Sequence, residues 1–442
     1  MLQTCLQSVG GLAMIEGSYD VVIAGAGAGG ATLARELSRK GKRVLVAERG
    51  KFEEKVGTVR DALGFYDLQG LLQQAPQSPE GVKLWRALLA GGSTMITLGN
   101  TTRCLGEDLK AFGIDLEESF QEAEADLGVN PLNESFLSKG SARVKEAAQA
   151  LGYPMEFTPK CIDLERCTHC GNCQLGCPHG AKWSAVRYLE EALQCGAEIA
   201  TGWVVEKVLI ENGRAAGLVC RKGKRLVNMR GEVTILAAGG IGTPAILQRS
   251  GFEQAGDGLF MDLLVNVYGL TDGDNMLAEP PMSLVNLQFR EREGFILSTY
   301  IAPGRGGLFL DLGAEGMTLP IRRLIGLMVK TSDESAGRVH ADGSFSKPVT
   351  DRDQRRLDTG AELAREILIK AGAREDTIIV SGPGGGHPGG TAAIGRVVDE
   401  ALQTEVPGLY ICDGSVLPHA PGMPPMLTII ALGKWLSRQL LQ

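Results

Sequence analysis

The fold is decided by residues 19–48, which read YDVVIAGAGAGGATLARELSRKGKRVLVAE. An apolar, β-branched run leads directly into a glycine-rich turn, a helical pattern that ends at Gly41, and a second apolar run. This order predicts a strand, a tight turn, a helix and a second strand. Together they make the opening of a βαβ unit, so the sequence predicts an α/β fold.

Gly25, Gly27 and Gly30 form the pattern GxGxxG between the predicted strand and the predicted helix. Glycines at this place let the backbone approach a pyrophosphate, and the N-terminus of the helix then stabilises the negative charge of the pyrophosphate. Glu48 ends the second strand, where a carboxylate can accept hydrogen bonds from the ribose hydroxyls of an adenosine. A tight turn without functional meaning is the alternative. The strand, the helix and Glu48 together favour a dinucleotide site.

The composition is typical of a large cofactor-dependent enzyme. The 442 residues are about three times a usual single-domain length, which predicts two domains. The 52 acidic and 45 basic residues give a net charge of −7, which argues against nucleic acid as a partner. Sixty glycines among 44% hydrophobic and 22% charged residues exclude disorder and collagen, and they suggest backbone that approaches a ligand closely.

The sequence predicts a cytoplasmic protein. Its first eighteen residues lack the basic start and the continuous apolar core of a signal peptide. No apolar run reaches the roughly 18–20 residues that span a bilayer, so we expect no transmembrane segment.

Five of the ten cysteines crowd between residues 161 and 177, which suggests a metal site rather than a disulfide scaffold. Four of them have the spacing of a bacterial ferredoxin run, Cys-x2-Cys-x2-Cys-x3-Cys-Pro, and are Cys167, Cys170, Cys173 and Cys177. Thiolates at these spacings can converge on one [4Fe–4S] cluster.

Two questions about this run stay open. A structural zinc ion is the alternative to iron–sulfur, because Cys170 and Cys173 also form CxxC and because His169 and His179 lie beside them; a metal-free loop is less favoured. In two-cluster ferredoxins the fourth cysteine of such a run binds the other cluster. The fourth ligand is therefore Cys177 or, in reserve, Cys161.

The remaining chain predicts a second nucleotide-domain unit and a change of architecture. Residues 233–251, VTILAAGGIGTPAILQRSG, repeat the strand, turn and helix pattern. Apolar and polar runs alternate from about residue 257 to 380, as in an antiparallel sheet with one exposed face, and we assign them to a substrate domain. Residues 428–441, TIIALGKWLSRQLL, predict a final helix.

In these motifs the chain resembles the glucose–methanol–choline (GMC) family of flavin oxidoreductases, most closely its cholesterol-oxidase-like and iron–sulfur-bearing bacterial branches. The resemblance covers nearly the whole chain in several separated motifs in the right order. They are GAGAGG with Glu48, GGST at 91–94, the cysteine run leading into GAKWS at 180–184, ILAAGGIGTPAIL at 235–247 and GGGHPGGTAAIG at 384–395 with the segment that follows it.

The resemblance implies FAD, held by a discontinuous Rossmann-type domain. That domain would comprise residues 17–256, including the cysteine loop 161–183, and residues 381–442, around a smaller α+β substrate domain with an antiparallel sheet at 257–380. It also implies a role for each of several residues. Gly91, Gly92 and Ser93 would lie along the pyrophosphate and flavin, the backbone of Val205 would meet the adenine, and Asp413 with Gly414 would hold the ribityl chain.

His387 in HPGGT matches the family's active-site histidine near flavin N5. Alcohol oxidation needs a group that takes the hydroxyl proton while the hydride moves to the flavin, and imidazole titrates in a suitable range. A histidine that caps a glycine-rich loop is the alternative.

The sequence departs from the family at the second active-site position. The family has Asn or His there, whereas this chain has Pro424, followed by Pro425, and proline has no side-chain donor. We expect that His419 in LPHAPG assists His387, or that the chemistry is not ordinary alcohol oxidation. A surface histidine is the alternative for His419.

The sequence thus predicts an FAD-dependent dehydrogenase that oxidises a CH–OH group of an organic substrate, or runs in reverse. Hydride would pass to flavin N5, and electrons would leave one at a time through the [4Fe–4S] cluster to a ferredoxin, another flavoprotein or a quinone-linked subunit. Two alternatives remain. One is an electron-transfer or reductase subunit of a larger complex, and the other is a flavin enzyme that reduces a C=C or C=O bond and carries a structural metal.

Overall fold

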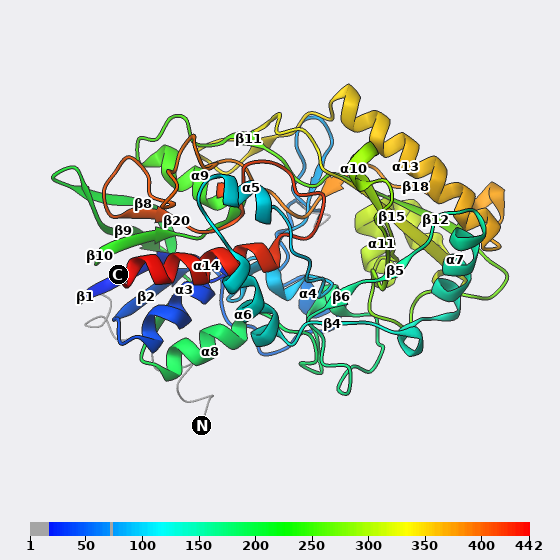
Figure 1. The fold of residues 1–442 in the computed structure, drawn as a ribbon, viewed down its shortest axis with the longest axis horizontal. Helices are drawn as coiled ribbons and strands as arrows, with labels where there is room; N and C mark the ends of the chain where they lie inside the picture. The colour runs from blue at the N-terminus through cyan, green and yellow to red at the C-terminus, as the bar shows by residue number, and fades with distance from the viewer. Residues whose placement is uncertain (1–16, 71–73) are drawn as a thin grey trace.

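The computed structural model describes residues 17–70 and 74–442, and its first strands confirm the predicted α/β opening. β1 (Ser18–Ala24) and β2 (Val44–Glu48) pair in parallel, and α3 (Ala28–Arg39) connects them. Both strands are apolar and largely buried, as expected for a parallel sheet with both faces covered. Figure 1 shows this part of the fold at the left.

The first sheet gathers strands that are far apart in the sequence. Its order is β7–β2–β1–β10–β9–β8, and β20 pairs in parallel with β10, which pairs in parallel with β1. Their bounds are β7 (Glu198–Thr201), β8 (Val204–Glu211), β9 (Arg214–Lys222), β10 (Arg225–Leu236) and β20 (Leu409–Ile411). A strand from near the C-terminus therefore completes a sheet begun near residue 18, which is the discontinuous Rossmann-type arrangement that was predicted.

A second, mainly antiparallel sheet occupies the other half of the molecule (Figure 1). Its central strands are β12 (Leu264–Leu270), β15 (Leu324–Thr331), β14 (Phe295–Thr299) and β13 (Leu284–Asn286). Short strands from elsewhere join it: β3 (Lys83–Leu84), β5 (Glu156–Phe157), β18 (Ile379–Val380) and β19 (Gly384–Gly385). Because β3, β5 and β19 lie outside residues 257–380, the sheet is not made by that segment alone, and the predicted domain boundaries stay a prediction.

Helix α13 (Asp351–Lys370) covers one face of the second sheet. Gly360 in α13 lies so close to Val329 that a Cβ there would be 2.3 Å from its side chain. Because side chains alternate along a strand, Val329 and Leu327 point toward α13, and Met328 and Lys330 point to the opposite face. That opposite face is the one that borders the large cavity described below.

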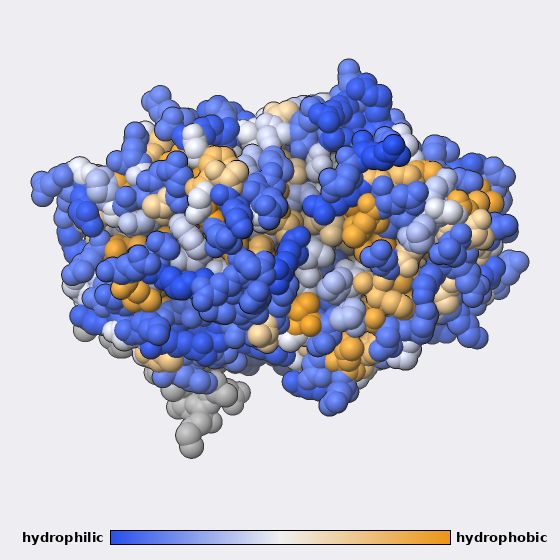
Figure 2. All heavy atoms as spheres, viewed as in Figure 1, coloured by the Kyte–Doolittle hydropathy of each residue, from blue (hydrophilic) through white to orange (hydrophobic). Residues whose placement is uncertain are grey.

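The other helices surround the two sheets. The principal ones are α5 (Gly106–Ala111), α6 (Glu117–Leu127), α7 (Lys139–Ala150), α8 (Val186–Gln194), α9 (Gly239–Arg249), α11 (Gly304–Leu312) and α14 (Met426–Leu440). Within 17–70 and 74–442, none of the helices is both long and apolar enough to cross a bilayer. The face in Figure 2 is mainly hydrophilic, with separate apolar areas.

The carboxylate of Asp126 in α6 joins helices from both ends of the chain. Its Oδ2 accepts hydrogen bonds from Arg35 of α3 at 2.6 Å and from Tyr188 of α8 at 3.0 Å. Lys434 of α14 lies 2.7 Å from the same oxygen. The Arg35 and Lys434 side chains are each only 5% exposed, and Asp126 shares the balancing of their charges with Glu36, Glu122 and Glu191. Although burial opposes ionisation, these bonds lower the pKa of Asp126 to about 2.

We predict that Asp126→Asn lowers the free energy of unfolding at pH 7 by about 2–3 kcal/mol, since it leaves two buried cations undercompensated. The folded-state pKa lies below the ordinary value, so the wild-type stabilisation is complete above about pH 4 and is lost as the pH falls toward 2. Thermal and urea unfolding at several pH values measure both effects. Asp115→Asn is the control, because the Asp115–Lys110 pair is exposed on both sides. Equal stabilities of Asp126→Asn and wild type at pH 7 would contradict this account.

Candidate active site

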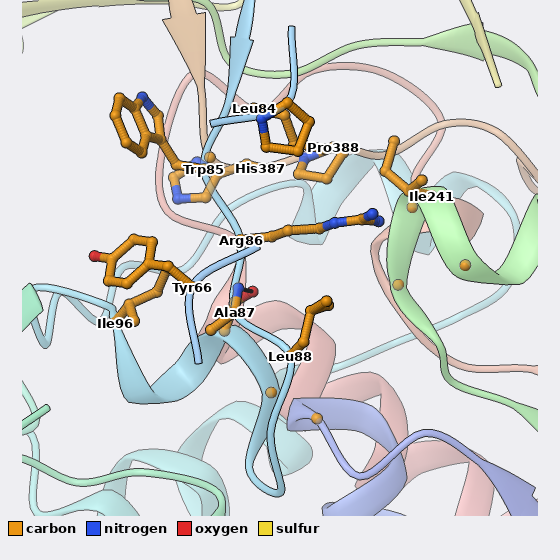
Figure 3. A pocket seen from close by; sticks show the side chains of 18 of the residues that line it. Tyr66, Leu84, Trp85, Arg86, Ala87, Leu88, Ile96, Ile241, His387 and Pro388 are labelled. Atoms are coloured by element: carbon orange, nitrogen blue, oxygen red, sulfur yellow. Dashed lines mark hydrogen bonds between the residues drawn. The ribbon is translucent and has the colours of Figure 1, made fainter. Parts of the chain in front are cut away.

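A cavity of about 1400 Å³ lies where the two sheets meet and is lined by residues from both. The glycine-rich turn and β8 line one end of the cavity. The second sheet and α11 line the other. Val59 and Leu63 also line it and are 38% and 50% exposed, so they mark a side that opens to solvent. Figure 3 shows Tyr66, Trp85, Arg86 and His387 around this space.

The GxGxxG glycines serve two different purposes. A Cβ on Gly25, whose φ is +99°, would lie 2.4 Å from the Ala237 carbonyl oxygen, and one on Gly30 would lie 2.0 Å from that of Gly25. These two glycines therefore permit close backbone packing. A Cβ on Gly27 would meet no atom within 4 Å, and Gly27 lines the cavity at the start of α3. The space beside Gly27 and the N-terminus of α3 suits a pyrophosphate.

Glu48 fixes the shape of this turn. Its Oε2 accepts a hydrogen bond from the Ala26 N–H at 2.8 Å, and its Oε1 accepts one from the Gly50 N–H at 2.7 Å. Burial raises the pKa of Glu48 in spite of these bonds. Glu48 lines the cavity, so the same carboxylate that holds the turn also faces the predicted ribose position.

The turn at residues 91–93 lies against the GxGxxG turn. The Gly91 N–H donates to the Ala26 carbonyl at 3.0 Å, and a Cβ on Gly92 would lie 2.9 Å from Gly27 Cα. Ser93 Oγ accepts a hydrogen bond from the Ala87 N–H at 3.2 Å. Gly92 and Ser93 line the cavity next to Gly27, so two glycine-containing turns form one cradle.

Two further predicted cofactor positions lie on the same wall. Val205 in β8 lines the cavity, and its carbonyl accepts a hydrogen bond from Arg249 at 3.2 Å. Asp413 Oδ2 accepts from the Gly239 N–H at 2.8 Å and from Thr243 Oγ1 at 2.5 Å, which joins β20 to the second glycine turn. The predicted residues that line the cavity directly are Gly25, Gly27, Glu48, Gly92, Ser93, Val205, Asp413 and Gly414, whereas Gly30 and Gly91 support their turns from behind.

His387 lines the cavity and is held by a buried carboxylate that the sequence analysis missed. The imidazole Nδ1 lies 2.9 Å from Oδ2 of Asp262, whose Oδ1 accepts a hydrogen bond from the Gly422 N–H at 2.9 Å. Burial, together with the charge of Lys330, lowers the pKa of His387 well below its usual value. The lowered pKa keeps the imidazole uncharged at neutral pH. Burial raises the pKa of Asp262 to about 7; when Asp262 is ionised, Nδ1 donates its proton to the carboxylate and Nε2 is the free acceptor.

The structure does not bring His419 into the same cavity as His387. The His419 side chain is 53% exposed, its Nε2 lies 2.9 Å from Asp108, and it does not line the cavity. Pro424 and Pro425 do line the cavity, as does Lys330 of β15. Lys330 was also missed, although a lysine in the apolar strand LIGLMVKT is a signal that the sequence does carry.

The four cysteines of the ferredoxin-like run line one small cavity of about 20 Å³, together with His169 and His179. None of them forms a disulfide, and burial raises the pKa of the Cys173 thiol to about 11. Cys161, the reserve ligand, is buried nearby but does not line this cavity. Over the described ranges, no set of three or more His, Cys, Asp or Glu side chains is already arranged to hold a metal ion. The four thiols therefore share one cavity, but their side chains are not arranged as ligands of a metal.

The cysteine loop nevertheless forms part of the wall of the large cavity. Gln174, between two of the cysteines, lines that cavity and accepts hydrogen bonds from Tyr66 at 2.9 Å and Tyr300 at 3.1 Å. Lys182 lines the small cavity and donates to the carbonyls of Met95 at 2.8 Å and Thr97 at 2.9 Å, directly after the 91–93 turn. The two cavities thus share a boundary.

Comparisons with known proteins agree with this arrangement. Two family models described as GMC oxidoreductase match residues 9–264 and 333–433. A protein of Methanocaldococcus jannaschii is 30% identical over 96% of this chain and 100% of its own length. A long-chain-alcohol oxidase of Arabidopsis thaliana is 24% identical over 93% of this chain and 65% of its own length.

Two solved structures share the fold. Pyridoxine 4-oxidase from Mesorbium loti superposes with a TM-score of 0.73 at 17% identity, over 95% of this chain and 98% of the other. Formate oxidase from Aspergillus oryzae superposes with a TM-score of 0.74 at 14% identity, over 96% and 98%. The finer assignment to an iron–sulfur-bearing or cholesterol-oxidase-like branch stays a prediction. The motifs, the fold and the family matches agree, and the chain belongs to the GMC oxidoreductase family.

Proposed function

We propose that this protein is an FAD-dependent oxidoreductase that oxidises a CH–OH group of an organic substrate. The observation that carries the proposal is the neutral His387, oriented by Asp262, in the same cavity as the GxGxxG turn. FAD, when bound, supplies an acceptor for the hydride that leaves the carbon atom. The family membership and a relative named as a long-chain-alcohol oxidase support this class of substrate.

The residues around the cavity fit FAD. The N-terminus of α3, the open space beside Gly27 and the adjoining Gly92 would hold the pyrophosphate. Glu48 would face the adenosine ribose, the backbone of Val205 the adenine, and Asp413 with Gly414 the ribityl chain. One solved relative is described as formate oxidase with a modified FAD, which supports the same cofactor here.

His387 would take the hydroxyl proton of the substrate. It would act in the form in which Asp262 is ionised: Nδ1 then donates to Asp262, Nε2 is free to accept the proton, and the carboxylate stabilises the imidazolium that forms. Asp262 is in turn oriented by the Gly422 N–H, so the dyad is preorganised by the chain segment that carries Pro424. His387 is therefore the catalytic residue of the proposal, and Asp262 is its positioning residue.

A finer part of the proposal concerns the electrons. We propose that the cysteine cavity assembles a [4Fe–4S] cluster and that the acceptor is a protein such as a ferredoxin, another flavoprotein or a quinone-linked subunit. The ferredoxin spacing, the four thiols around one cavity and its shared boundary with the large cavity support this. The cysteine side chains would have to turn toward one another on binding, because they are not arranged as ligands in the described structure.

A second candidate is an oxidase that passes electrons to oxygen and uses the cysteine loop only as structure. The observation that favours it is the naming of several relatives as oxidases, among them pyridoxine 4-oxidase and the Arabidopsis long-chain-alcohol oxidase. Rapid reoxidation of the reduced flavin by air, without bound iron, would identify this candidate.

We predict that Gly27→Val reduces the FAD content of the purified protein several-fold, because its side chain enters the space that the pyrophosphate would occupy. The ratio of flavin to protein absorbance measures the effect. Gly273→Val is the matched control, since a Cβ there also meets no atom within 4 Å but the residue lies outside the cavity. Full FAD content in Gly27→Val would place the pyrophosphate elsewhere.

We predict that His387→Gln slows anaerobic reduction of the flavin by about 10²–10⁴-fold. Its pKa is lowered, so the wild-type rate is maintained down to pH 6.5 and falls only at lower pH, as Nε2 becomes protonated. This acid limb should be absent in His387→Gln. Stopped-flow absorbance with an alcohol chosen by screening measures both effects, and His419→Gln should leave the rate nearly unchanged. A loss in His419→Gln as large as that in His387→Gln would instead support the sequence-based role of His419.

We predict that protein purified without oxygen contains about four iron atoms and four acid-labile sulfides per chain and gives an EPR signal after reduction. Cys173→Ser should lose most of the iron, whereas Cys195→Ser should not, since Cys195 lies outside the cysteine cavity. One zinc atom per chain without iron would rule out the cluster and leave the FAD-dependent function standing.

A further inference from the structure

Lys330 occupies an unusual place for a charged side chain. It lies in β15, in the middle of the second sheet, where its neighbours across the strands are Leu264 and Ile296. The residue is only 3% exposed. Its side chain enters the large cavity on the same sheet face as Met328 and shares that cavity with His387.

Lys330 differs from the other buried lysines in having no partner. Lys160 and Lys182 donate to backbone carbonyls, Lys347 lies 2.9 Å from Asp333, and Lys434 lies 2.7 Å from Asp126. Among residues 17–70 and 74–442, by contrast, no hydrogen bond or ion pair reaches the Nζ of Lys330.

The nearby charges do not satisfy Lys330. Asp262 attracts it electrostatically, but the two oxygens of Asp262 are engaged by the Gly422 N–H and by His387. Burial lowers the pKa of Lys330 to about 8, which leaves the ammonium mainly protonated at pH 7. A buried cation without a partner is strongly destabilising, so its retention points to an anion that arrives with a ligand.

The chemistry of that anion follows from the surroundings. Lys330 shares the cavity-facing side of the sheet with Leu264, Met328 and the uncharged Asn266, so among the described residues its ammonium is the one cation there and balances a single negative charge. A carboxylate carries one negative charge at neutral pH, whereas a phosphate ester carries nearly two. The other wall near His387 offers Pro424, which has no donor, so an ionic contact replaces the hydrogen bond that a side-chain donor there would give.

We infer that Lys330 binds a carboxylate of the substrate, and that the substrates are hydroxy acids whose hydroxyl group meets His387. This inference rests on the proposed oxidation of a CH–OH group and names the class of compound on which it acts. Lys330 is a specificity-determining residue in this account, since it selects the anion and takes no proton from the hydroxyl.

The test compares matched pairs of compounds on the holoenzyme without oxygen. Glycolate, lactate, mandelate and 4-hydroxybutyrate are each compared with the diol in which CH2OH replaces the carboxylate. Binding is followed by the flavin difference spectrum, and turnover by flavin bleaching. We expect at least one hydroxy acid to bind ten-fold or more tightly than its diol, and we expect Lys330→Met to abolish that preference.

A second measurement needs no ligand. The unliganded Lys330→Met holoenzyme should melt about 2–5 °C above wild type, because it removes an unpaired buried charge at nearly constant volume. Lys347→Met is the matched control and should melt below wild type, because it leaves the buried Asp333 without its partner. A melting temperature of Lys330→Met lower than wild type would show that the ammonium has a partner within the protein and would overturn the inference.

The outcomes separate the inference from the proposed function. Equal reduction of the flavin by diols in wild type and Lys330→Met, with no hydroxy acid bound more tightly, would overturn the role of Lys330 and leave the oxidation of CH–OH groups standing. Tight binding of hydroxy acids that depends on Lys330, without any flavin bleaching, would support the carboxylate site and overturn the proposed reaction. Failure of every hydroxy acid to bind wild type would overturn the carboxylate site.

Discussion

The close approach of two glycine-containing backbone segments is the constraint on which the rest of the structure depends. A Cβ on Gly29 would lie 1.9 Å from the carbonyl oxygen of Cys412, and one on Gly433 would lie 2.9 Å from Thr32. Helix α3 therefore packs directly against the end of β20 and against α14, a contact that side chains would prevent. Because of this contact, Asp413 lies beside the GxGxxG turn although the two are separated by almost the whole chain, and one cavity can be built from both ends of the sequence.

The buried charged side chains around the cavity have two different roles. Glu48 and Asp413 are acceptors for backbone N–H groups, and Asp413 also for Thr243, so their burial serves to hold turns in place. Asp262 is held in the same way by the Gly422 N–H, but its second oxygen orients a side chain that faces the cavity. The same arrangement thus holds the two glycine-containing turns and positions His387, whereas the Nζ of Lys330 has no such partner among the described residues. A buried charge without a partner is the place where a ligand can supply one.

The parts of the fold that follow from local pattern were predictable from the sequence. The pattern of apolar residues and glycines from Tyr19 to Glu48 predicts the strands, the turn and the helix of that segment. The motifs and their order were sufficient to identify the family. The site residues that only tertiary packing brings together were not predictable from the sequence. Asp262 lies in an apolar stretch and reaches His387 only because two distant segments meet, and His419 lies near the expected position in sequence but pairs with Asp108 at the surface. The short strands β3, β5 and β19 are two residues long, which is too short for any alternation to be recognised.

Pro424 connects these observations. Pro424, which the resemblance assigns to the family's second active-site position, lines the cavity and offers no side-chain donor there. The same segment supplies the Gly422 N–H that holds Asp262, so it acts through the backbone rather than through a side chain. A cation on the opposite sheet can then compensate for the missing donor without disturbing that segment, because β15 is fixed independently by its pairing with β12 and β14. In the proposed reaction, the charge of Lys330 on one wall would therefore replace a hydrogen bond that Pro424 on the other wall does not offer.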